Sequence, residues 1–213
     1  MNQLQLQKAK FQMLSQHLMQ RGITDGRVLN AMTQVPREEF VPNHLIEFSY
    51  QDSPLPIGFE QTISQPFVVA LMCQLLNLTG QETVLDVGTG SGYQAAVLSK
   101  LAKNVITVEI IPDLAKNARK IFKKLNYKNI HVYTSDANKG YPKFAPYDAI
   151  KSAAATPKIP LAWINQLKDN GVIVTPKSTN FSQDLIRLVK KGNNLVEEKW
   201  GDVRFVPLVK AKS

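Results

Sequence analysis

From residue 83 onward, this chain of 213 residues alternates between short apolar strands and helices. The expected strands cover 83–87, 105–109, 130–134, 147–152 and 172–175, and the expected helices cover 91–102, 113–126 and 161–167. Strands that alternate with helices in this way form a parallel sheet with crossover helices on both faces. Three further strands are expected at the end of the chain, over 184–191, 195–200 and 205–209, and they suit an antiparallel edge. The expected fold is therefore α/β, with a doubly wound, mainly parallel sheet and antiparallel C-terminal strands.

The first part of the chain has a different character. Apolar residues at helical spacing predict a helix over 4–20, and a second, short helix is expected over 26–32. Four prolines lie between residues 35 and 64, and because prolines break helices and weaken strands, we expect a long ordered loop there. Long loops inside compact domains are often functional. Ser64, near the end of this loop, is expected to cap a helix whose apolar run extends from Phe67 to Leu78.

The clearest functional signal is the segment VLDVGTGSGYQAAVL, residues 84–98, in which a buried strand leads through a glycine loop into a helix. Its glycines are Gly88, Gly90 and Gly92. Glycines let the backbone turn sharply against a ligand, and the start of the helix offers free N–H groups. Tyr93 stands where a dinucleotide-binding fingerprint requires Gly or Ala, and Asp86 before the glycines would repel a pyrophosphate. A second acid, Glu109, ends the next strand, where a carboxylate can hold two ribose hydroxyls.

These features are typical of methyltransferases that use S-adenosylmethionine, because an acid before the loop suits a ligand that carries an ammonium or sulfonium group. Asp136, after the third strand, is a further candidate, since an acid there can accept a hydrogen bond from the adenine amino group. Its alternative role is to cap a turn before Gly140. We expect an N-terminal helical and active-site-loop subdomain over 1–78 and a Rossmann-like domain that binds S-adenosylmethionine over 79–213.

Other chemistries find little support in the sequence. The fourth strand is followed by Ser152–Ala155, which is not the Asp/Asn-Pro-Pro-aromatic motif of methyltransferases that act on amino groups. The single cysteine, Cys73, follows Met72 and not a proline, so it is expected to be a buried hydrophobe and not a nucleophile for cytosine methylation. One cysteine also excludes a cysteine zinc site, and no metal is expected. The three histidines are scattered and are expected to be structural or exposed.

Composition and charge limit which binding partners and which cellular compartment can be expected. Hydrophobic residues make up 44% of the chain and charged residues 20%, which fits a globular protein and argues against disorder. The net charge of +9 could attract nucleic acid, but the basic residues are spread along the chain without an interleaved aromatic stripe. No stretch is apolar enough to span a bilayer, and the glutamine-rich beginning is unlike a secretory signal. We expect a cytoplasmic protein with no nucleic-acid or membrane partner.

The chain resembles the protein-L-isoaspartate O-methyltransferase family from about residue 35 to residue 208. The matching pieces are VPREEFVP, PLPIGFEQTISQP, VLDVGTGSGYQAAVLS, the acid in TVEII, APYDAI followed by SAAA, QLKDNGVIVTP, and VRFVPL. QTISQP and VRFVPL are specific to this family, whereas many methyltransferases share the glycine loop. The resemblance implies a monomeric enzyme that methylates the α-carboxyl of L-isoaspartyl residues in damaged proteins and peptides, as a step of their repair.

The resemblance also implies roles for particular residues. The family's active-site serine corresponds to Ser64, and Gln61 and Thr62 shape the same catalytic loop. The segment 203–208 is expected to close over the substrate. The residues expected to bind S-adenosylmethionine are Asp86, Gly88, Thr89, Gly90, Gly92, Glu109 and Asp136.

Four departures from the family pattern, at Glu60, Ala137, Lys151 and Lys177, leave substrate preference and turnover open. Glu60 stands where the family has a glycine, and a left-handed backbone there would cost about 1 kcal/mol or more. One alternative function is therefore a methyltransferase of the same scaffold that acts on a different carboxylate or on a small molecule. Another is a degenerate member that binds a partner without turnover. A nucleic-acid methyltransferase is a third, and its affinity would fall steeply with salt.

Overall fold

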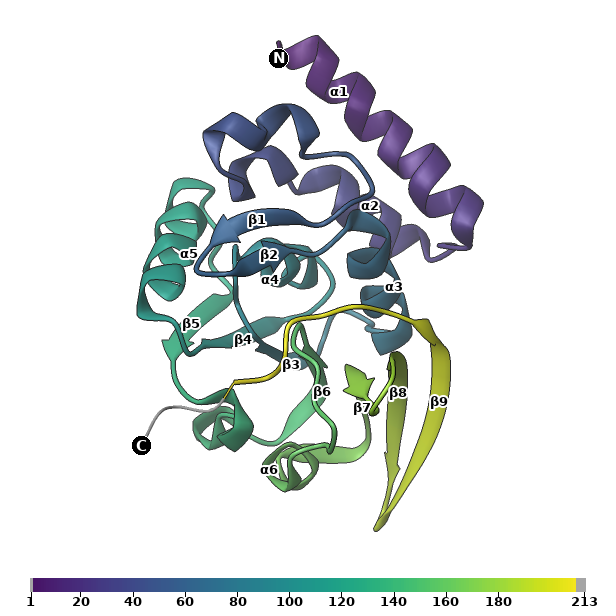
Figure 1. Ribbon diagram of the computed structural model, residues 1–213. Coiled ribbons are helices and arrows are strands. Elements are labelled where there is room, and N and C mark those ends of the chain that lie inside the picture. The colour runs from purple at the N-terminus through teal and green to yellow at the C-terminus, as the bar shows by residue number, and fades with distance from the viewer. Residues whose placement is uncertain (1, 210–213) are drawn as a thin grey trace.

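Seven strands form one sheet in the order β5-β4-β3-β6-β7-β8-β9 in the computed structural model, which describes residues 2–209 (Figure 1). The first five strands of that order run parallel to their neighbours, and β8 and β9 are added antiparallel. The strands are β3 (Thr83–Val87), β4 (Asn104–Glu109), β5 (Ile130–Thr134), β6 (Tyr147–Ser152), β7 (Leu167–Ser178), β8 (Gln183–Lys191) and β9 (Asn194–Asp202). The predicted fold class is confirmed.

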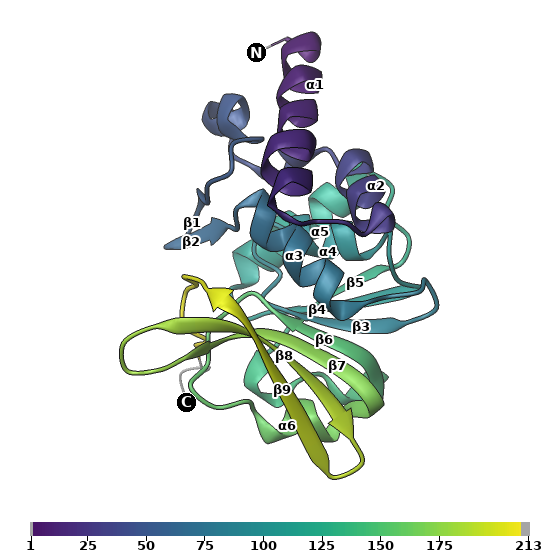
Figure 2. The same cartoon turned by 90° about the vertical axis from the view of Figure 1, so that its right-hand side faces the viewer.

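Helices cover both faces of this sheet because side chains alternate along each strand. Val84 and Val105 belong to one core, which packs against α3, α4 and α5, whereas Leu85 and Ile106 belong to a second core beneath α6 (Figure 2). The helices are α1 (Gln3–Gln12), α2 (Gly26–Gln34), α3 (Pro66–Leu76), α4 (Tyr93–Leu98), α5 (Pro112–Lys124) and α6 (Leu161–Asn165). Within residues 2–209, none of them is long and apolar enough to cross a membrane.

The order of the strands fixes where a ligand can bind. The chain moves outward from β3 to β4 and β5 and then returns to β6 on the other side of β3. Parallel sheets bind ligands outside the carboxyl ends of the strands at such a switch point, because the two connections diverge there and leave a crevice. The glycine loop follows β3 directly, so it lies at this place.

The N-terminal part is more regular than the sequence predicted. The helix expected over 4–20 is present, with α1 continuing as π-helical Met13–Leu18 and a 3₁₀ turn at Met19–Arg21. The segment expected to be a long loop contains two 3₁₀ helices, Arg37–Phe40 and Asn43–Phe48, and a short antiparallel hairpin. The hairpin consists of β1 (Leu55–Gly58) and β2 (Gln61–Ile63). Its two strands form a separate sheet, in which Pro56 is tolerated because each strand is an edge.

Two local predictions were wrong. No strand forms over 205–209, where a single parallel bridge joins Ala155 to Pro207. Proline lacks the N–H group that a longer ladder would need. Ser64 does not cap α3 either, because Gln65 holds the N-cap position and makes no side-chain capping bond there.

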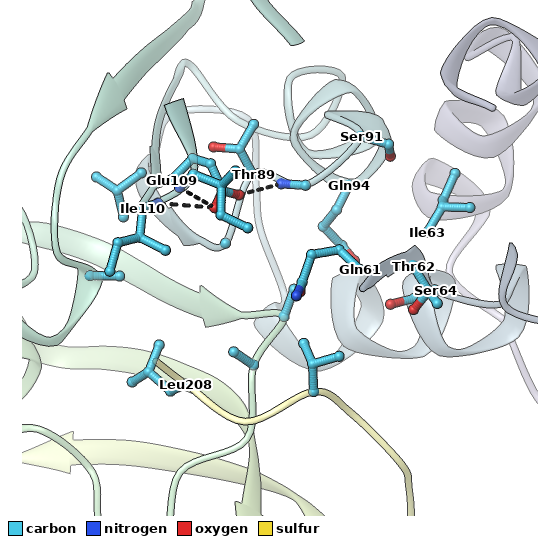
Figure 3. A pocket seen from close by; sticks show the side chains of 18 of the residues that line it. Gln61, Thr62, Ile63, Ser64, Thr89, Ser91, Gln94, Glu109, Ile110 and Leu208 are labelled. Atoms are coloured by element: carbon cyan, nitrogen blue, oxygen red, sulfur yellow. Dashed lines mark hydrogen bonds between the residues drawn. The ribbon is translucent and has the colours of Figure 1, made fainter. Parts of the chain in front are cut away.

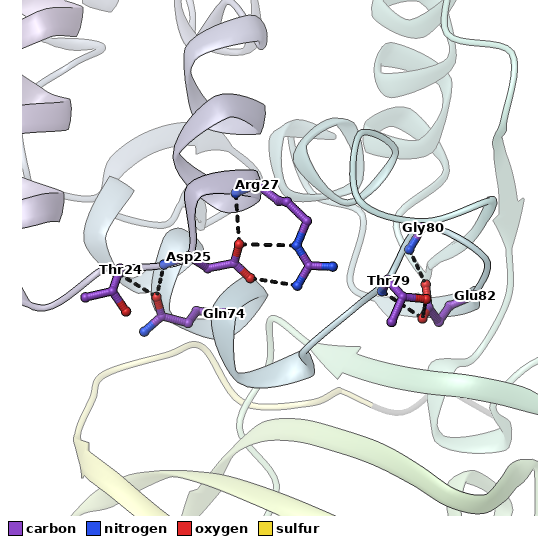
Figure 4. A network of polar contacts seen from close by, with 7 residues as sticks. All are labelled: Thr24, Asp25, Arg27, Gln74, Thr79, Gly80 and Glu82. Atoms are coloured by element: carbon purple, nitrogen blue, oxygen red, sulfur yellow. Dashed lines mark hydrogen bonds and ion pairs between the residues drawn. The ribbon is translucent and has the colours of Figure 1, made fainter.

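Side-chain hydrogen bonds tie the N-terminal helices to the layer on the sheet (Figure 4). The Gln74 side-chain oxygen, on α3, accepts from the backbone N–H groups of Thr24 at 2.8 Å and Asp25 at 2.9 Å. Asp25 in turn caps α2 by accepting from the backbone of Arg27 at 2.8 Å. One hydrophobic core also continues from the N-terminal helices to the sheet. The division of the chain at residue 78 stays a prediction.

The turn of the hairpin carries the departure at Glu60. Phe59 and Glu60 both have left-handed φ angles, 53° and 57°, as a two-residue type I′ turn requires. We expect Glu60→Gly to raise the free energy of unfolding by about 1 kcal/mol, because glycine removes the strain of a side chain in this conformation. Urea denaturation of the two proteins measures the difference. A less stable variant would mean that the Glu60 side chain contributes more than its backbone strain costs.

Candidate functional site

A pocket with about 810 Å³ of empty space lies at the carboxyl ends of β3, β4 and β6, at the switch point of the sheet. The hairpin segment and the C-terminal segment form its other walls (Figure 3). In this view Glu109 and Ile110 lie at one end and Thr62 and Ser64 at the other. The pocket brings together seven of the predicted site residues, Gln61, Thr62, Ser64, Gly88, Thr89, Gly90 and Glu109.

The glycine loop forms the wall of the pocket above β3. Gly88, Gly90 and Gly92 have φ angles of 84°, 53° and 92°, so all three use a conformation that favours glycine. Gly88 and Gly90 line the pocket, whereas Gly92 does not. A Cβ atom on Gly92 would lie 2.7 Å from the Phe122 ring, so this glycine is needed for packing of the loop against α5. The third glycine therefore supports the loop without forming part of the pocket wall.

Glu109 is the polar group at one end of the pocket and is only 6% exposed. One carboxylate oxygen accepts from the Gly90 N–H at 2.8 Å, and the other accepts from Ile110 and Ile111 at 2.9 and 3.1 Å. The side chain thus joins the end of β4 to the glycine loop, a contact that the sequence did not predict. A carboxylate has about four acceptor positions, so one remains for a ligand hydroxyl.

Asp86 does not form part of the pocket wall, which differs from its predicted role beside a cationic ligand. Its side chain is fully buried and accepts from the Lys151 ammonium at 3.0 Å and from the Thr107 hydroxyl at 2.7 Å. The reason is register: Asp86 stands beside Thr107 on β4 and beside Lys151 on β6, with the three side chains in one row across the sheet. The charge of Asp86 is therefore compensated by the protein itself.

Asp136 lies just outside the pocket, while its neighbour Ala137 lines it. The Asp136 carboxylate caps a 3₁₀ turn over Ala137–Lys139 and accepts from the backbone and side-chain nitrogens of Asn138, both at 2.9 Å. This is the turn-capping role that the sequence left open. Its contact with an adenine amino group stays a prediction.

The hairpin segment places Gln61, Thr62 and Ser64 along one wall of the pocket. Within residues 2–209 the Ser64 hydroxyl makes no hydrogen bond, whereas the Ser64 carbonyl accepts from the Arg37 guanidinium at 2.7 Å. Arg37 is fully buried, and a second nitrogen of its side chain donates to the Ser49 carbonyl at 2.6 Å. Arg37 thus holds the backbone on which Ser64 stands.

A second, wider hollow adjoins the pocket and contains about 2130 Å³ of empty space. We call it the groove. Its wall includes the exposed Phe181 and Trp200, which lie in the β7–β8 turn and on β9. The residues that line both the pocket and the groove are Thr62, Ser64, Ala153 and Val206. Ser64 therefore lies where the two cavities meet.

The C-terminal segment crosses both cavities. Val203 to Val206 line the groove, and Val206 to Val209 line the pocket. The Val206 carbonyl accepts from Ala155 at 2.8 Å, and the Leu208 N–H donates to the Ala155 carbonyl at 2.7 Å. These two bonds hold the segment over the end of β6.

Cys73 and the histidines, for which the sequence predicted no catalytic role, do not line the pocket or the groove. Burial raises the pKa of the Cys73 thiol to about 12, so it remains protonated and unreactive at neutral pH. None of the three histidines lines the pocket or the groove. Among residues 2–209, no cluster of side chains is suited to hold a metal ion.

Sequence reasoning missed several residues of the site, among them three with long polar side chains. Lys151 and Gln94 line the pocket, and Arg37 supports its wall. Lys151 had a detectable signal, since a lysine in an otherwise apolar parallel strand needs a partner. For Gln94 and Arg37 the sequence gave no such signal, because their positions depend on how distant segments pack.

Comparisons with known proteins agree with this geometry. The family model described as "Protein-L-isoaspartate(D-aspartate) O-methyltransferase (PCMT)" matches residues 8–213. A protein-L-isoaspartate O-methyltransferase of Syntrophobacter fumaroxidans is 47% identical over 97% of this chain and 96% of its own length. Another, from Marinobacter nauticus, is 49% identical over 90% of this chain and 89% of its own.

Solved structures give the same result. A Plasmodium falciparum protein, described as a protein-L-isoaspartate O-methyltransferase in complex with S-adenosyl-L-homocysteine, is 28% identical to this chain. It superposes with a TM-score of 0.81 over 92% of this chain and 97% of its own.

Proposed function

This chain belongs to the protein-L-isoaspartate(D-aspartate) O-methyltransferase family. On that premise we propose that its pocket binds the cofactor and its groove binds the polypeptide. The enzyme uses S-adenosylmethionine to methylate the α-carboxyl of L-isoaspartyl residues in damaged proteins and peptides. The methyl ester can then cyclise and reopen, which makes methylation a repair step. Roles for individual side chains follow from where they lie.

The pocket has the chemistry that S-adenosylmethionine requires. At one end the Glu109 carboxylate can accept from a ribose hydroxyl, and the apolar side chains of Ile110, Ile111 and Leu208 also line the pocket and suit the adenine. Gly88 and Gly90 present backbone without side chains to the pocket.

We propose that the groove receives the polypeptide and that Ser64 meets the isoaspartyl carboxylate. The groove is open and larger than the pocket, as a peptide segment requires, and it reaches the pocket through Thr62, Ser64, Ala153 and Val206. The Ser64 hydroxyl makes no bond within residues 2–209, so it is available to donate to a carboxylate oxygen. This placement of Ser64 between the two cavities is the observation that carries the proposal.

The reaction needs no catalytic base. Bound S-adenosylmethionine supplies a methyl group on a sulfonium. An α-carboxyl has a pKa of about 3.5, so the substrate is already an ionised nucleophile at neutral pH. The protein has to align it, exclude water and orient one oxygen. A neutral hydroxyl can orient the carboxylate without the quenching effect of a full positive charge.

We expect Ser64→Ala to lower kcat by roughly 10- to 100-fold, the loss of one hydrogen bond to a charged group. Its affinity for S-adenosylmethionine should stay nearly unchanged, and so should its melting temperature, because Ser64 caps no helix. The measurement is transfer of tritiated methyl groups to an isoaspartyl peptide, with the matching aspartyl peptide as the control. Full activity in a folded variant would contradict the role of Ser64.

We propose further that the enzyme works as a monomer in the cytoplasm. The pocket and the groove are both lined by segments of the same chain. The single cysteine, Cys73, is unpaired, which suits a reducing compartment. Sedimentation of the active protein measures its mass in solution, and a dimer at assay concentration would contradict the first point.

A further inference from the structure

Lys151 is a charged residue inside the pocket wall whose bonding is incomplete. Its side chain is 1% exposed, and its ammonium lies 3.0 Å from a carboxylate oxygen of Asp86. Within residues 2–209, Asp86 is the one acceptor that this ammonium contacts. An ammonium has three N–H donors, and burying a donor without a partner is costly. Two donors are therefore left over at a place where the side chain faces the pocket.

The position of Lys151 separates it from the groove. It lines the pocket together with Gln94, but it does not line the groove, which shares Ser64 and Ala153 with the pocket. Lys151 thus faces the space for the cofactor and not the path by which the polypeptide enters. An ammonium against the substrate carboxylate would also weaken it as a nucleophile.

Lys151 and Glu109 line that space from two strands that are not neighbours. Glu109 ends β4 and Lys151 is on β6, with β3 between them. Neighbouring strands are about 4.8 Å apart, so the two strands are separated by about 10 Å along the edge of the sheet. A ligand whose ribose contacts Glu109 and which extends across the glycine loop places its other end near Lys151.

We propose that Lys151, held in place by Asp86, donates to the carboxylate at the amino-acid end of S-adenosylmethionine. The inference rests on the proposed placement of the cofactor in the pocket. It assigns Asp86 an indirect role, because its carboxylate orients the ammonium and balances its charge. The pair then presents two N–H donors to an anion while the floor of the pocket stays neutral overall.

The test compares two ligands that differ at the amino-acid end. S-adenosylhomocysteine carries the carboxylate, and 5′-methylthioadenosine has the same adenine, ribose and sulfur without it. Calorimetry should show that Lys151→Met lowers the affinity for S-adenosylhomocysteine by about 10- to 150-fold, which is the range for the loss of a charge-assisted hydrogen bond. The affinity for 5′-methylthioadenosine should change by no more than about twofold.

Two further variants keep the result interpretable. If Lys151→Met does not fold because Asp86 is left buried and unpaired, the double variant Asp86→Asn/Lys151→Met removes both charges and should show the same selective loss. Glu109→Gln is the matched control for the pocket. It should lower the affinity for both ligands to a similar extent, since both carry the ribose.

Three outcomes would overturn the inference. In the first, Lys151→Met lowers the affinity for both ligands equally. In the second, a folded Lys151→Met variant binds both ligands as the native chain does. In the third, its affinity for S-adenosylhomocysteine is unchanged but its KM for the isoaspartyl peptide is raised. The last would assign Lys151 to the substrate carboxylate. A wild-type chain that binds S-adenosylhomocysteine through Lys151 but methylates no isoaspartyl peptide would contradict the proposed function and leave the inference standing.

Discussion

A Gly90→Val variant is expected to bind S-adenosylmethionine roughly 100-fold or more weakly than the native chain while remaining folded. The Gly90 N–H donates to Glu109 at 2.8 Å, and its φ angle of 53° strains a β-branched side chain. A valine would therefore crowd the Ile57 side chain, shift the loop and break its bond to Glu109. Calorimetry gives the affinity, and circular dichroism checks the fold.

Gly90→Ala is the matched control for this experiment. Its Cβ atom would meet the Ile57 side chain at 3.6 Å, an ordinary contact, so only the backbone strain of about 1 kcal/mol is added. The alanine variant should keep most of its affinity. If valine at this position also binds the cofactor normally, the loop is only a turn and the cofactor placement fails.

The largest effect on stability is expected from Arg37→Met, which should lower the free energy of unfolding by about 2–5 kcal/mol. The substitution leaves the carbonyl groups of Ser49 and Ser64 without their buried donor. It also removes the guanidinium from the Tyr93 ring, whose centroid lies 4.7 Å from it. Although burial lowers the pKa of Arg37, an arginine stays charged at neutral pH, so its bonds are charge-assisted.

Arg37→Met should also lower kcat, because the backbone at Ser64 loses its anchor. Urea denaturation measures the stability, and methyl transfer at low temperature measures the rate in the folded fraction. Arg37→Lys keeps the charge but lacks the fork that reaches two carbonyls, so it should recover only part of either loss. Stability equal to the native chain in Arg37→Met would show that water or a rearranged loop replaces the guanidinium.

Much of the fold could be predicted because it depends on local patterns. The strands β3, β5 and β6 begin and end at the predicted residues. The seven-stranded sheet and its antiparallel end follow from the order of those elements. The left-handed turn at Glu60 was likewise foreseeable as a cost, because a side chain stands where the backbone favours glycine.

The site was predictable only in part. Gly88 and Gly90 were predicted as site residues and line the pocket, because the signal of a glycine loop lies in consecutive residues. The pairing of Asp86 with Lys151 was not, since the two are 65 residues apart and meet through strand register. The same holds for Arg37, which reaches the Ser64 backbone across 27 residues.

The sequence by itself determined the alternation of strands and helices, the glycine loop and the family to which the chain belongs, because these depend on residue types in consecutive order. The tertiary structure decided which acid faces the cofactor pocket and which is buried in an ion pair. It also decided that Ser64 lies between the pocket and the groove. Burial and charge pairing depend on which side chains strand register and packing bring together, and neighbours in the sequence carry little of that information.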